Sequence, residues 1–287
     1  MLTIEEGAAA IGGLVASDKP FFVGRNGTIE LQTIDFWNIH RIHGNTYRKE
    51  IKDFLMRNAG VFPATEESFD AWCKEYVGGL AQLDITAAGW YKPMEAVEDK
   101  MLGICAPKVV RCPLRSLEPY YVGADLQWTR ALKGRVAVVS SFTGTIQSQL
   151  KNSAWPATLF PGDIEWSFVR TGYSRVLAGG HESCCWPYPI LTWQQAADYV
   201  VTEVVKSGAT TALIGCGGLG MIIGARLKAQ GVSAIVIGGA IQVLFGIKGK
   251  RWATHDVISR FWNDQWVWPS HDEVPAWSAL VEGGCYW

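Results

Sequence analysis

The chain has 287 residues, of which 48% are hydrophobic and 18% charged, and its formal net charge is −1. This composition excludes a disordered chain, and a charge so near zero gives no overall field to attract nucleic acid or an anionic membrane. The most apolar run, "SAIVIGGAIQVLFGI", is too short to cross a bilayer and is interrupted by two glycines and Gln242. We therefore expect a protein without a transmembrane segment.

The seven cysteines and the start of the chain indicate the compartment. Seven is an odd number, Cys184 and Cys185 are adjacent, and no pair has C-x-x-C spacing. Reduced thiols fit this pattern better than a disulfide framework. The first residues also lack the basic and then apolar pattern of a secretory signal, so we expect a cytoplasmic protein.

The first half of the chain alternates short apolar runs with stretches of helical period. "PFFVG" at 20–24 predicts a buried strand, and helices are expected over 28–42, with Thr28 as N-cap, over about 46–58 and over 66–83. "DITAAGW" and "KVVRCP" are typical of strands or strand ends. Lys133-Gly134 marks a turn, which we take as the seam between two halves, 1–134 and 135–287.

The second half predicts "VAVVSSF", "IEWSFVRTG", "TTALIG" and "AIVIGG" as strands. Helices are expected after the first strand, capped by Thr143 or Thr145, over 192–208, and over 219–230. Such alternation is typical of βαβ units. The expected fold is α/β, with a Rossmann-like parallel sheet flanked by helices and two subdomains.

One turn in the second half has the G-x-G-x-x-G spacing. In "ALIGCGGLG", Gly215, Gly217 and Gly220 lie between a strand and a helix, where glycines allow close approach of an anion to helix amides. NAD-binding proteins usually have an acid about 20 residues further on, to bind the ribose. Here Gly238 and Gly239 occupy that place. Either the glycines only allow close packing of helix and sheet, or they bind a phosphate or sugar phosphate.

A basic, glycine-rich segment follows the next strand. "GIKGKRW" contains Lys248, Lys250 and Arg251, and arginine can bind a diphosphate with two hydrogen bonds at once. Gly239 and Gln242 precede it. A run of lysine and arginine can also be a solvated surface.

A second candidate site follows the first strand. Gly24, Arg25, Asn26, Gly27 and Thr28 form a turn, and Glu30 comes next, in the first turn of the expected helix. A carboxylate there can complement the helix dipole; beside Arg25 it can also bind a divalent metal or accept a proton from a hydroxyl.

This N-terminal segment resembles the R-F-G-D-G-E nucleotide-sugar motif of the GT-D type glycosyltransferases. The resemblance continues through "LEPYYV", "QWTRALKGRVAVVSSFTGTIQSQ" and the glycine turn to "FWNDQWVWPS" and "VEGGCYW", and so covers most of the chain. The C-terminal phrases are similar to bacterial and viral surface-polysaccharide proteins grouped with GT-D enzymes.

The resemblance implies transfer of a sugar from a nucleoside-diphosphate donor to a glycan or glycoconjugate, usually with Mn²⁺ or Mg²⁺. Arg25 and Gly27 match the motif's Arg and Gly, and Glu30 matches its last Glu. The motif's Asp falls on Thr28, which leaves Glu30 as the only metal-binding acid of the motif. Lys248, Lys250 and Arg251 could neutralise the diphosphate instead.

Glu30 or Asp84 is the expected catalytic acid or base, and Asp84 lies close in sequence to Trp90, whose ring could stack on a sugar. Asp84 could equally be a capping residue. The histidines show no metal-binding spacing with the cysteines, and Ser140, Ser141 and Ser183 lack a nucleophile-elbow context. Two alternatives stay open: a pseudo-enzyme that binds nucleotide or glycan, and an NAD-dependent oxidoreductase.

Overall fold

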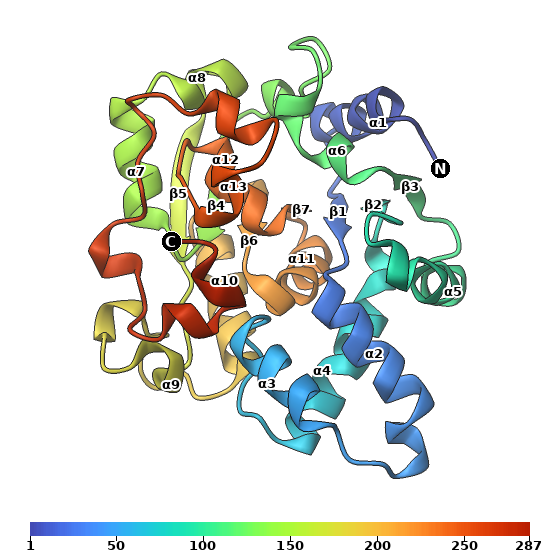
Figure 1. Cartoon of the computed structure of the whole chain (residues 1–287). Helices are drawn as coiled ribbons and strands as arrows, with labels where there is room; N and C mark the ends of the chain where they lie inside the picture. The colour runs from blue at the N-terminus through green and yellow to red at the C-terminus, as the bar shows by residue number, and fades with distance from the viewer.

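The computed structural model describes residues 1–287 and contains one sheet of seven parallel strands with helices on both faces (Figure 1). The strands are β1 (Phe22–Arg25), β2 (Ile85–Ala87), β3 (Val110–Cys112), β4 (Arg135–Ser140), β5 (Glu165–Arg170), β6 (Thr211–Gly215) and β7 (Ser233–Val236). Their order across the sheet is β3-β2-β1-β7-β6-β4-β5. The predicted α/β class with a Rossmann-like parallel sheet is confirmed.

The two halves expected from the sequence meet inside this sheet. Strands β1 to β3 come from residues 1–134 and strands β4 to β7 from residues 135–287. The halves join where β1 pairs with β7, with Phe22 opposite Ala234 and Val23 opposite Ile235. Residue 134 therefore separates two halves of one continuous sheet.

Thirteen α-helices accompany the strands. The longer ones are α1 (Ile4–Ala16), α2 (Thr28–Ile39), α3 (Lys49–Arg57), α4 (Glu66–Gly79), α5 (Glu95–Cys105), α7 (Thr143–Asn152), α10 (Trp193–Lys206) and α11 (Gly220–Ala229). The short ones are α6 (Leu114–Leu117), α8 (Trp155–Leu159), α9 (Arg175–Ala178), α12 (Ile241–Leu244) and α13 (Lys250–Ala253). None of these helices has both the length and the apolar character that a bilayer crossing requires.

The residues at the N-termini of the helices explain where some helices begin. They also correct the expected N-caps of α2 and α7. Helix α10 begins with a capping box, in which Thr192 and Gln195 each bind the other's backbone N–H. The N-cap of α2 is Gly27, so Thr28 is the first helical residue and not the expected cap. Neither Thr143 nor Thr145 caps α7. The Glu273 carboxylate does so from a distant segment, accepting from the Gly144 N–H at 2.6 Å.

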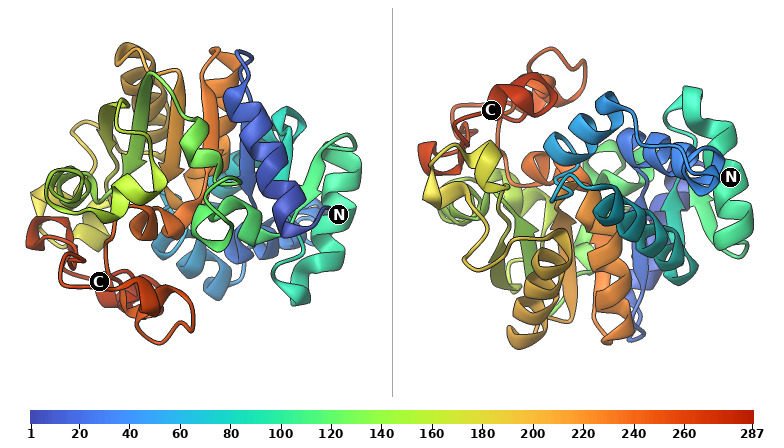
Figure 2. Two further views of the ribbon diagram at one scale, coloured as in Figure 1. Left: turned by 90° about the horizontal axis from the view of Figure 1, so that it is seen from above. Right: turned by 90° about the horizontal axis from the view of Figure 1, so that it is seen from below.

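The strands bury both faces, because alternate side chains point to opposite sides of a sheet. Ala212 and Ile214 of β6 belong to one hydrophobic cluster, with α2, α4, α10 and α11, whereas Leu213 belongs to the other, with α1, α7 and α12. Figure 2 shows α1 in front of the strands in the view from above, and α4, α10 and α11 in front of them from below. This three-layer order leaves one edge of the sheet, where the strands end, for ligands.

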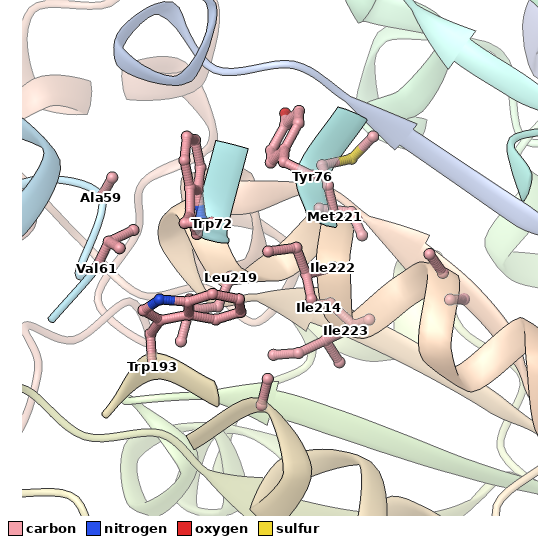
Figure 3. Close-up of a cluster of buried hydrophobic side chains, with 14 of the residues drawn as sticks. Ala59, Val61, Trp72, Tyr76, Trp193, Ile214, Leu219, Met221, Ile222 and Ile223 are labelled. Carbon is pink, nitrogen blue, oxygen red and sulfur yellow. The ribbon is translucent and has the colours of Figure 1, made fainter. Parts of the chain in front are cut away.

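Helix α11 packs closely on the sheet through glycine. A Cβ atom at Gly224 would lie 2.4 Å from the Phe22 ring, and one at Gly24 would lie 2.6 Å from the Met221 sulfur. The neighbouring cluster contains Trp72 and Trp193, which are fully buried (Figure 3). Gly24 therefore serves helix–sheet packing.

Replacing Trp193 by alanine should lower the free energy of unfolding by about 3–5 kcal/mol, because it removes a fully buried ring and leaves a cavity. It also removes the indole hydrogen bond to the Ser68 carbonyl, 3.1 Å long. Urea denaturation measures the change. Trp268→Ala is the control: this ring is 47% exposed, and its loss should cost less than about 1 kcal/mol. Equal losses would contradict the assignment of Trp193 to the core.

Candidate functional site

A cleft of about 580 Å³ lies at the carboxyl ends of the strands. Parallel strands bring the residues that follow them to the same edge of a sheet. The loops after all seven strands contribute, together with the end of α3 and the C-terminal segment. The residues that line the cleft include Arg25, Gly27, Glu30, Asn58, Ala59, Trp90, Tyr91, Gly215, Gly217, Gly238, Gly239, Arg251, Trp252, Glu282 and Tyr286.

Two arginine side chains converge on the glycine pair that follows β7. A Cβ atom at Gly238 would lie 2.3 Å from the Arg25 guanidinium, and one at Gly239 would lie 2.9 Å from that of Arg251. Gly238 also has φ +59°, which favours glycine. Both guanidinium groups thus lie directly on this backbone, which a side chain at either glycine would prevent.

The two arginines differ in their partners. Arg25 forms no ion pair and no side-chain hydrogen bond within the protein, and its guanidinium lies 5.3 Å from the centre of the Trp90 ring. Arg251 forms an ion pair with Glu282 and lies 4.4 Å from the centre of the Tyr286 ring. The cleft therefore contains one cation without a counter-ion and one whose counter-ion is internal.

Glu30 lies in the first turn of α2 and lines the same cleft. Its carboxylate folds back over Gly27, where a Cβ atom would lie 1.9 Å from Oε2. Burial raises the pKa of Glu30 above the usual glutamate range, the nearby charge of Arg25 opposes this, and Glu282 adds to it. A carboxylate whose pKa is raised is a stronger base than an ordinary glutamate and so is better suited to accept a proton.

Glu30 is the only acid of the N-terminal motif that could hold a Mn²⁺ or Mg²⁺ ion. Magnesium in sites of this kind is usually bound by one or two carboxylates together with substrate phosphates and water. The position of the motif's Asp is Thr28, and Glu282 is bound by Arg251. No three His, Cys, Asp or Glu side chains of the chain come together as metal ligands would.

The glycine turn after β6 is largely covered by the segment that follows α3. The Gly218 N–H donates to the Ala59 carbonyl at 2.8 Å, and a Cβ atom at Gly217, which has φ +48°, would lie 2.8 Å from the same oxygen. At Gly220 a Cβ atom would lie 2.9 Å from Val236. Gly215 and Gly217 still line the cleft, but this turn mainly packs against protein.

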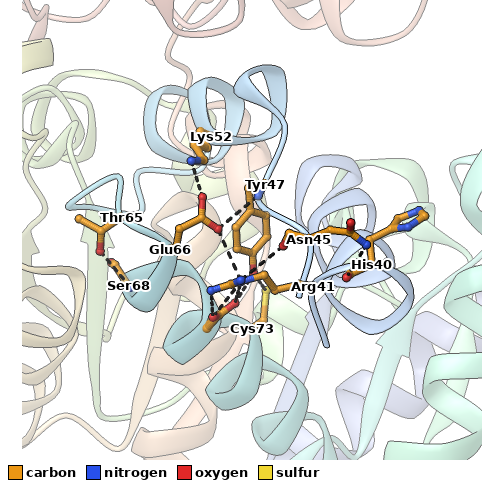
Figure 4. Close-up of polar contacts among 10 residues, drawn as sticks. His40, Arg41, Asn45, Tyr47, Lys52, Thr65, Glu66, Ser68 and Cys73 are labelled. Atoms are coloured by element: carbon orange, nitrogen blue, oxygen red, sulfur yellow. Dashed lines mark hydrogen bonds and ion pairs between the residues drawn. The ribbon is translucent and has the colours of Figure 1, made fainter. Parts of the chain in front are cut away.

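A polar network holds that covering segment in place (Figure 4). Arg41 binds Asp70 of α4 through two guanidinium nitrogens, at 3.1 and 3.0 Å, and the Tyr47 hydroxyl donates to Asp70 at 3.0 Å. Glu66 accepts from the Tyr47 N–H at 3.2 Å and pairs with Lys52. These contacts hold residues 41–52 against α4. They therefore fix the position of α3, whose C-terminal end places Asn58 and Ala59 at the cleft.

Three residues expected at the site from the N-terminal half are not in the cleft: Gly24, which packs against Met221 of α11, Asp84 and Asn26. Asp84 precedes β2 and therefore lies at the opposite edge of the sheet, where it accepts from the Phe22 N–H and from Lys228, both at 2.7 Å. Asn26 is fully buried, binds Glu98 at 2.8 Å, and accepts from the Trp90 indole through its backbone oxygen at 3.2 Å. Asp84 is a structural residue. Asn26 lies outside the cleft and helps to position Trp90 through the hydrogen bond to its indole.

Three residues expected from the C-terminal half are also outside the cleft. The Gln242 side chain is fully buried and donates to the Tyr286 carbonyl at 2.9 Å. Lys248 lies over Trp262, with its Nζ 5.5 Å from the ring centre. Lys250 does not line the cleft either. Of the predicted basic loop, only Arg251 reaches the site, because α13 begins at Lys250 and turns successive side chains in different directions.

Glu282 and Tyr286 line the cleft but are not expected there from the sequence. They come from the end of the chain, far from the other site residues in sequence. Glu282 is the only residue other than glycine with a positive φ, +47°, and Gly283 and Gly284 follow it. A "VEGG" stretch is therefore a local signal of an unusual turn, but nothing in it shows which cleft the turn faces.

Comparison of the chain with protein-family models, with curated proteins and with solved structures finds no match.

The raised pKa of Glu30 predicts a pH-dependent stability change. The native state holds this proton more tightly than the unfolded chain does, so ionisation of Glu30 costs stability as pH rises through the usual glutamate range up to the raised pKa. Glu30→Gln should therefore increase the free energy of unfolding at pH 7, and this gain should shrink towards zero below about pH 4. Urea denaturation at several pH values tests this.

Glu67→Gln is the matched control, because Glu67 also lies in the first turn of a helix but is exposed. It should give no gain at pH 7. A Glu30→Gln variant that is less stable than the wild type at pH 7 would contradict a net cost of ionising Glu30 in the folded protein.

Proposed function

We propose that this protein is a glycosyltransferase that takes a sugar from a nucleoside-diphosphate donor. The observation that carries the proposal is the convergence of Arg25 and Arg251 on Gly238–Gly239, with Arg25 in no ion pair and no side-chain hydrogen bond. Paired guanidinium groups beside a glycine backbone are suited to the two phosphates of a nucleotide sugar. The resemblance of the "GRNGTIE" segment to the GT-D motif supports the same ligand.

Aromatic side chains supply surfaces for the rest of such a donor. Trp90 and Tyr91 line one side of the cleft, and Trp252 and Tyr286 come from the C-terminal segment. Flat amphipathic rings of this kind stack on nucleobases and sugars. The volume of about 580 Å³ lies within the usual range for sites that bind small molecules.

Each residue has a distinct role in the proposed reaction. The bond between the sugar's anomeric carbon and the diphosphate oxygen breaks, and that carbon bonds to the acceptor's hydroxyl oxygen. Glu30 accepts the hydroxyl proton, and the electron pair of the broken bond leaves with the nucleoside diphosphate. Arg25 and Arg251 stabilise the charge that develops on the leaving diphosphate. Because Glu30 is the only acid of the motif left to hold a metal ion, the guanidinium groups provide most of this charge compensation.

Two features weigh against an NAD-dependent oxidoreductase. The strand end where an acid would bind the ribose has Gly238 and Gly239, with Arg25 against Gly238 and Arg251 against Gly239. Ala59 also covers the glycine turn on which the pyrophosphate would lie.

We further propose a surface glycan as the final acceptor, from the resemblance, and a cytoplasmic location. All seven cysteines are unpaired, which agrees with that location.

Replacing either arginine should weaken nucleoside-diphosphate binding. Charge-assisted hydrogen bonds contribute about 1.5–3 kcal/mol each, so Arg25→Gln and Arg251→Gln should lower the affinity for UDP or GDP roughly 10- to 100-fold. Binding of the nucleoside alone should change less than about twofold. Isothermal titration calorimetry measures both, and NAD should give no binding heat.

Lys248→Gln is the matched control, because Lys248 belongs to the same basic loop but lies outside the cleft. It should leave both affinities unchanged. If the arginine variants weaken nucleoside and diphosphate equally, the two guanidinium groups do not contact the phosphates.

A donor screen tests the reaction itself. Incubated with a panel of UDP- and GDP-sugars, the protein should hydrolyse or transfer from at least one of them without added Mn²⁺. The Glu30→Gln variant should be at least about 100-fold slower, because it lacks the proton acceptor. Glu67→Gln should retain the wild-type rate. Full activity of Glu30→Gln would leave Glu30 as a helix-start residue only, and absence of turnover with intact binding would favour a pseudo-enzyme.

A further inference from the structure

A second, smaller pocket lies beside the cleft at the edge of the sheet. Its volume is about 290 Å³, and it follows β5, the edge strand next to β4. The residues that define it here are Arg170, Arg175, Glu182, Trp186, Tyr188 and Tyr199. Trp186 lines this pocket and the cleft. The two cavities therefore share Trp186 as part of their walls.

Arg170, the last residue of β5, has no partner in the protein. Its Nε is buried without a hydrogen-bond acceptor, and its guanidinium forms no ion pair. Arg175, in the same pocket, is bound to Glu182 at 2.9 Å. Since Glu182 is the only acid in the lining, one positive charge stays uncompensated. A buried guanidinium N–H without an acceptor is costly, and it marks an arginine whose charge no protein group satisfies. An oxyanion in the pocket would pair with the part of the Arg170 guanidinium that lines it.

The other walls are aromatic. Tyr188 is 80% exposed and lies at the rim, whereas Trp186 is buried and packs edge-on against Tyr199, with 6.5 Å between the ring centres. Rings with hydroxyl or indole N–H groups provide both a stacking face and hydrogen bonds for a sugar. Together with an unpaired guanidinium, they match a sugar that carries a negative charge.

We propose that this second pocket binds an acidic sugar, a uronate or a sugar phosphate, through Arg170. As the acceptor end of a glycan, the sugar would lie across Trp186 from the donor. That the acidic sugar belongs to the acceptor rests on the proposed function; that the pocket binds an oxyanion does not. The donor phosphates would lie at the ends of β1 and β7, in the middle of the sheet. The acidic sugar would lie at the end of β5, which is the outermost strand on one side.

Binding of three simple probes tests the pocket. Methyl β-D-glucuronide and glucose 6-phosphate carry the two oxyanions, and methyl β-D-glucoside is their neutral counterpart. By isothermal titration or ligand-detected NMR, at least one acidic probe should bind at least tenfold more tightly than the neutral one. The acidic probe that does so identifies the oxyanion. Arg170→Gln should remove this preference.

Two further variants separate this inference from the proposed function. Arg25→Gln, which changes the donor cleft, should keep the preference for the acidic probe, and Arg170→Gln should keep the affinity for UDP or GDP. Arg135→Gln, a surface arginine paired with Glu165, is the matched control and should alter neither. If Arg170→Gln does not fold, Arg170→Lys replaces it. Lysine retains the positive charge but lacks the planar guanidinium, so this variant should bind the acidic probe at least about threefold more weakly than the wild type.

The inference is overturned if acidic and neutral probes bind the wild type equally, or if the Arg170 variants bind the acidic probe as well as the wild type does. Either result can occur while nucleoside diphosphates bind normally. Conversely, nucleoside diphosphates could fail to bind while the preference for the acidic probe still depends on Arg170. The protein would then have an acidic-sugar site but another activity.

Discussion

The pairing of β1 with β7 is the contact on which the rest of the site depends. Phe22 and Ala234 are 212 positions apart in the chain, yet they lie side by side in the sheet, and the Ala234 N–H donates to the Phe21 carbonyl at 2.8 Å. Because both strands end at the same edge, Arg25 reaches the Gly238 backbone directly. Neither half of the chain contains this arrangement alone. The cleft is a product of the way the two halves join.

The charges in the cleft suggest how ligand binding would proceed. Arg251 already has an acceptor in Glu282, so a diphosphate would have to displace that carboxylate from it. Arg25 has no such competitor and would bind without this exchange. Glu282 also contributes to the raised pKa of Glu30. Movement of Glu282 would therefore change the charge next to Glu30 as well, which couples the diphosphate end of the cleft to the proposed base.

The sequence predicted best those features that depend on local pattern. The buried strands, the helix over 192–208 and the pair Arg25 and Glu30 were found because strand ends and helix starts have recognisable residues. Helix α1 was missed although Thr3 and Glu6 form a capping box, a signal that could have been used. Local patterns define where an element begins, and in a parallel sheet this also defines which residues reach the ligand edge.

Side-chain direction and long-range contact could not be predicted in this way. Lys248, Lys250 and Arg251 have the same chemical character in sequence, but only Arg251 faces the cleft. Asp84 comes just before its strand rather than after it, and that difference of a few positions places it at the wrong edge of the sheet. Glu282 and Ala59 reach the site through tertiary packing, for which no spacing rule exists.

A crystal structure of the protein with a nucleoside diphosphate tests the central claim most directly. The account predicts the diphosphate in the cleft, with its oxygens within hydrogen-bonding distance of the Arg25 guanidinium and beside Gly238–Gly239, and with Arg251 released from Glu282. A nucleotide bound elsewhere, or one that leaves Arg25 without a contact, would contradict it.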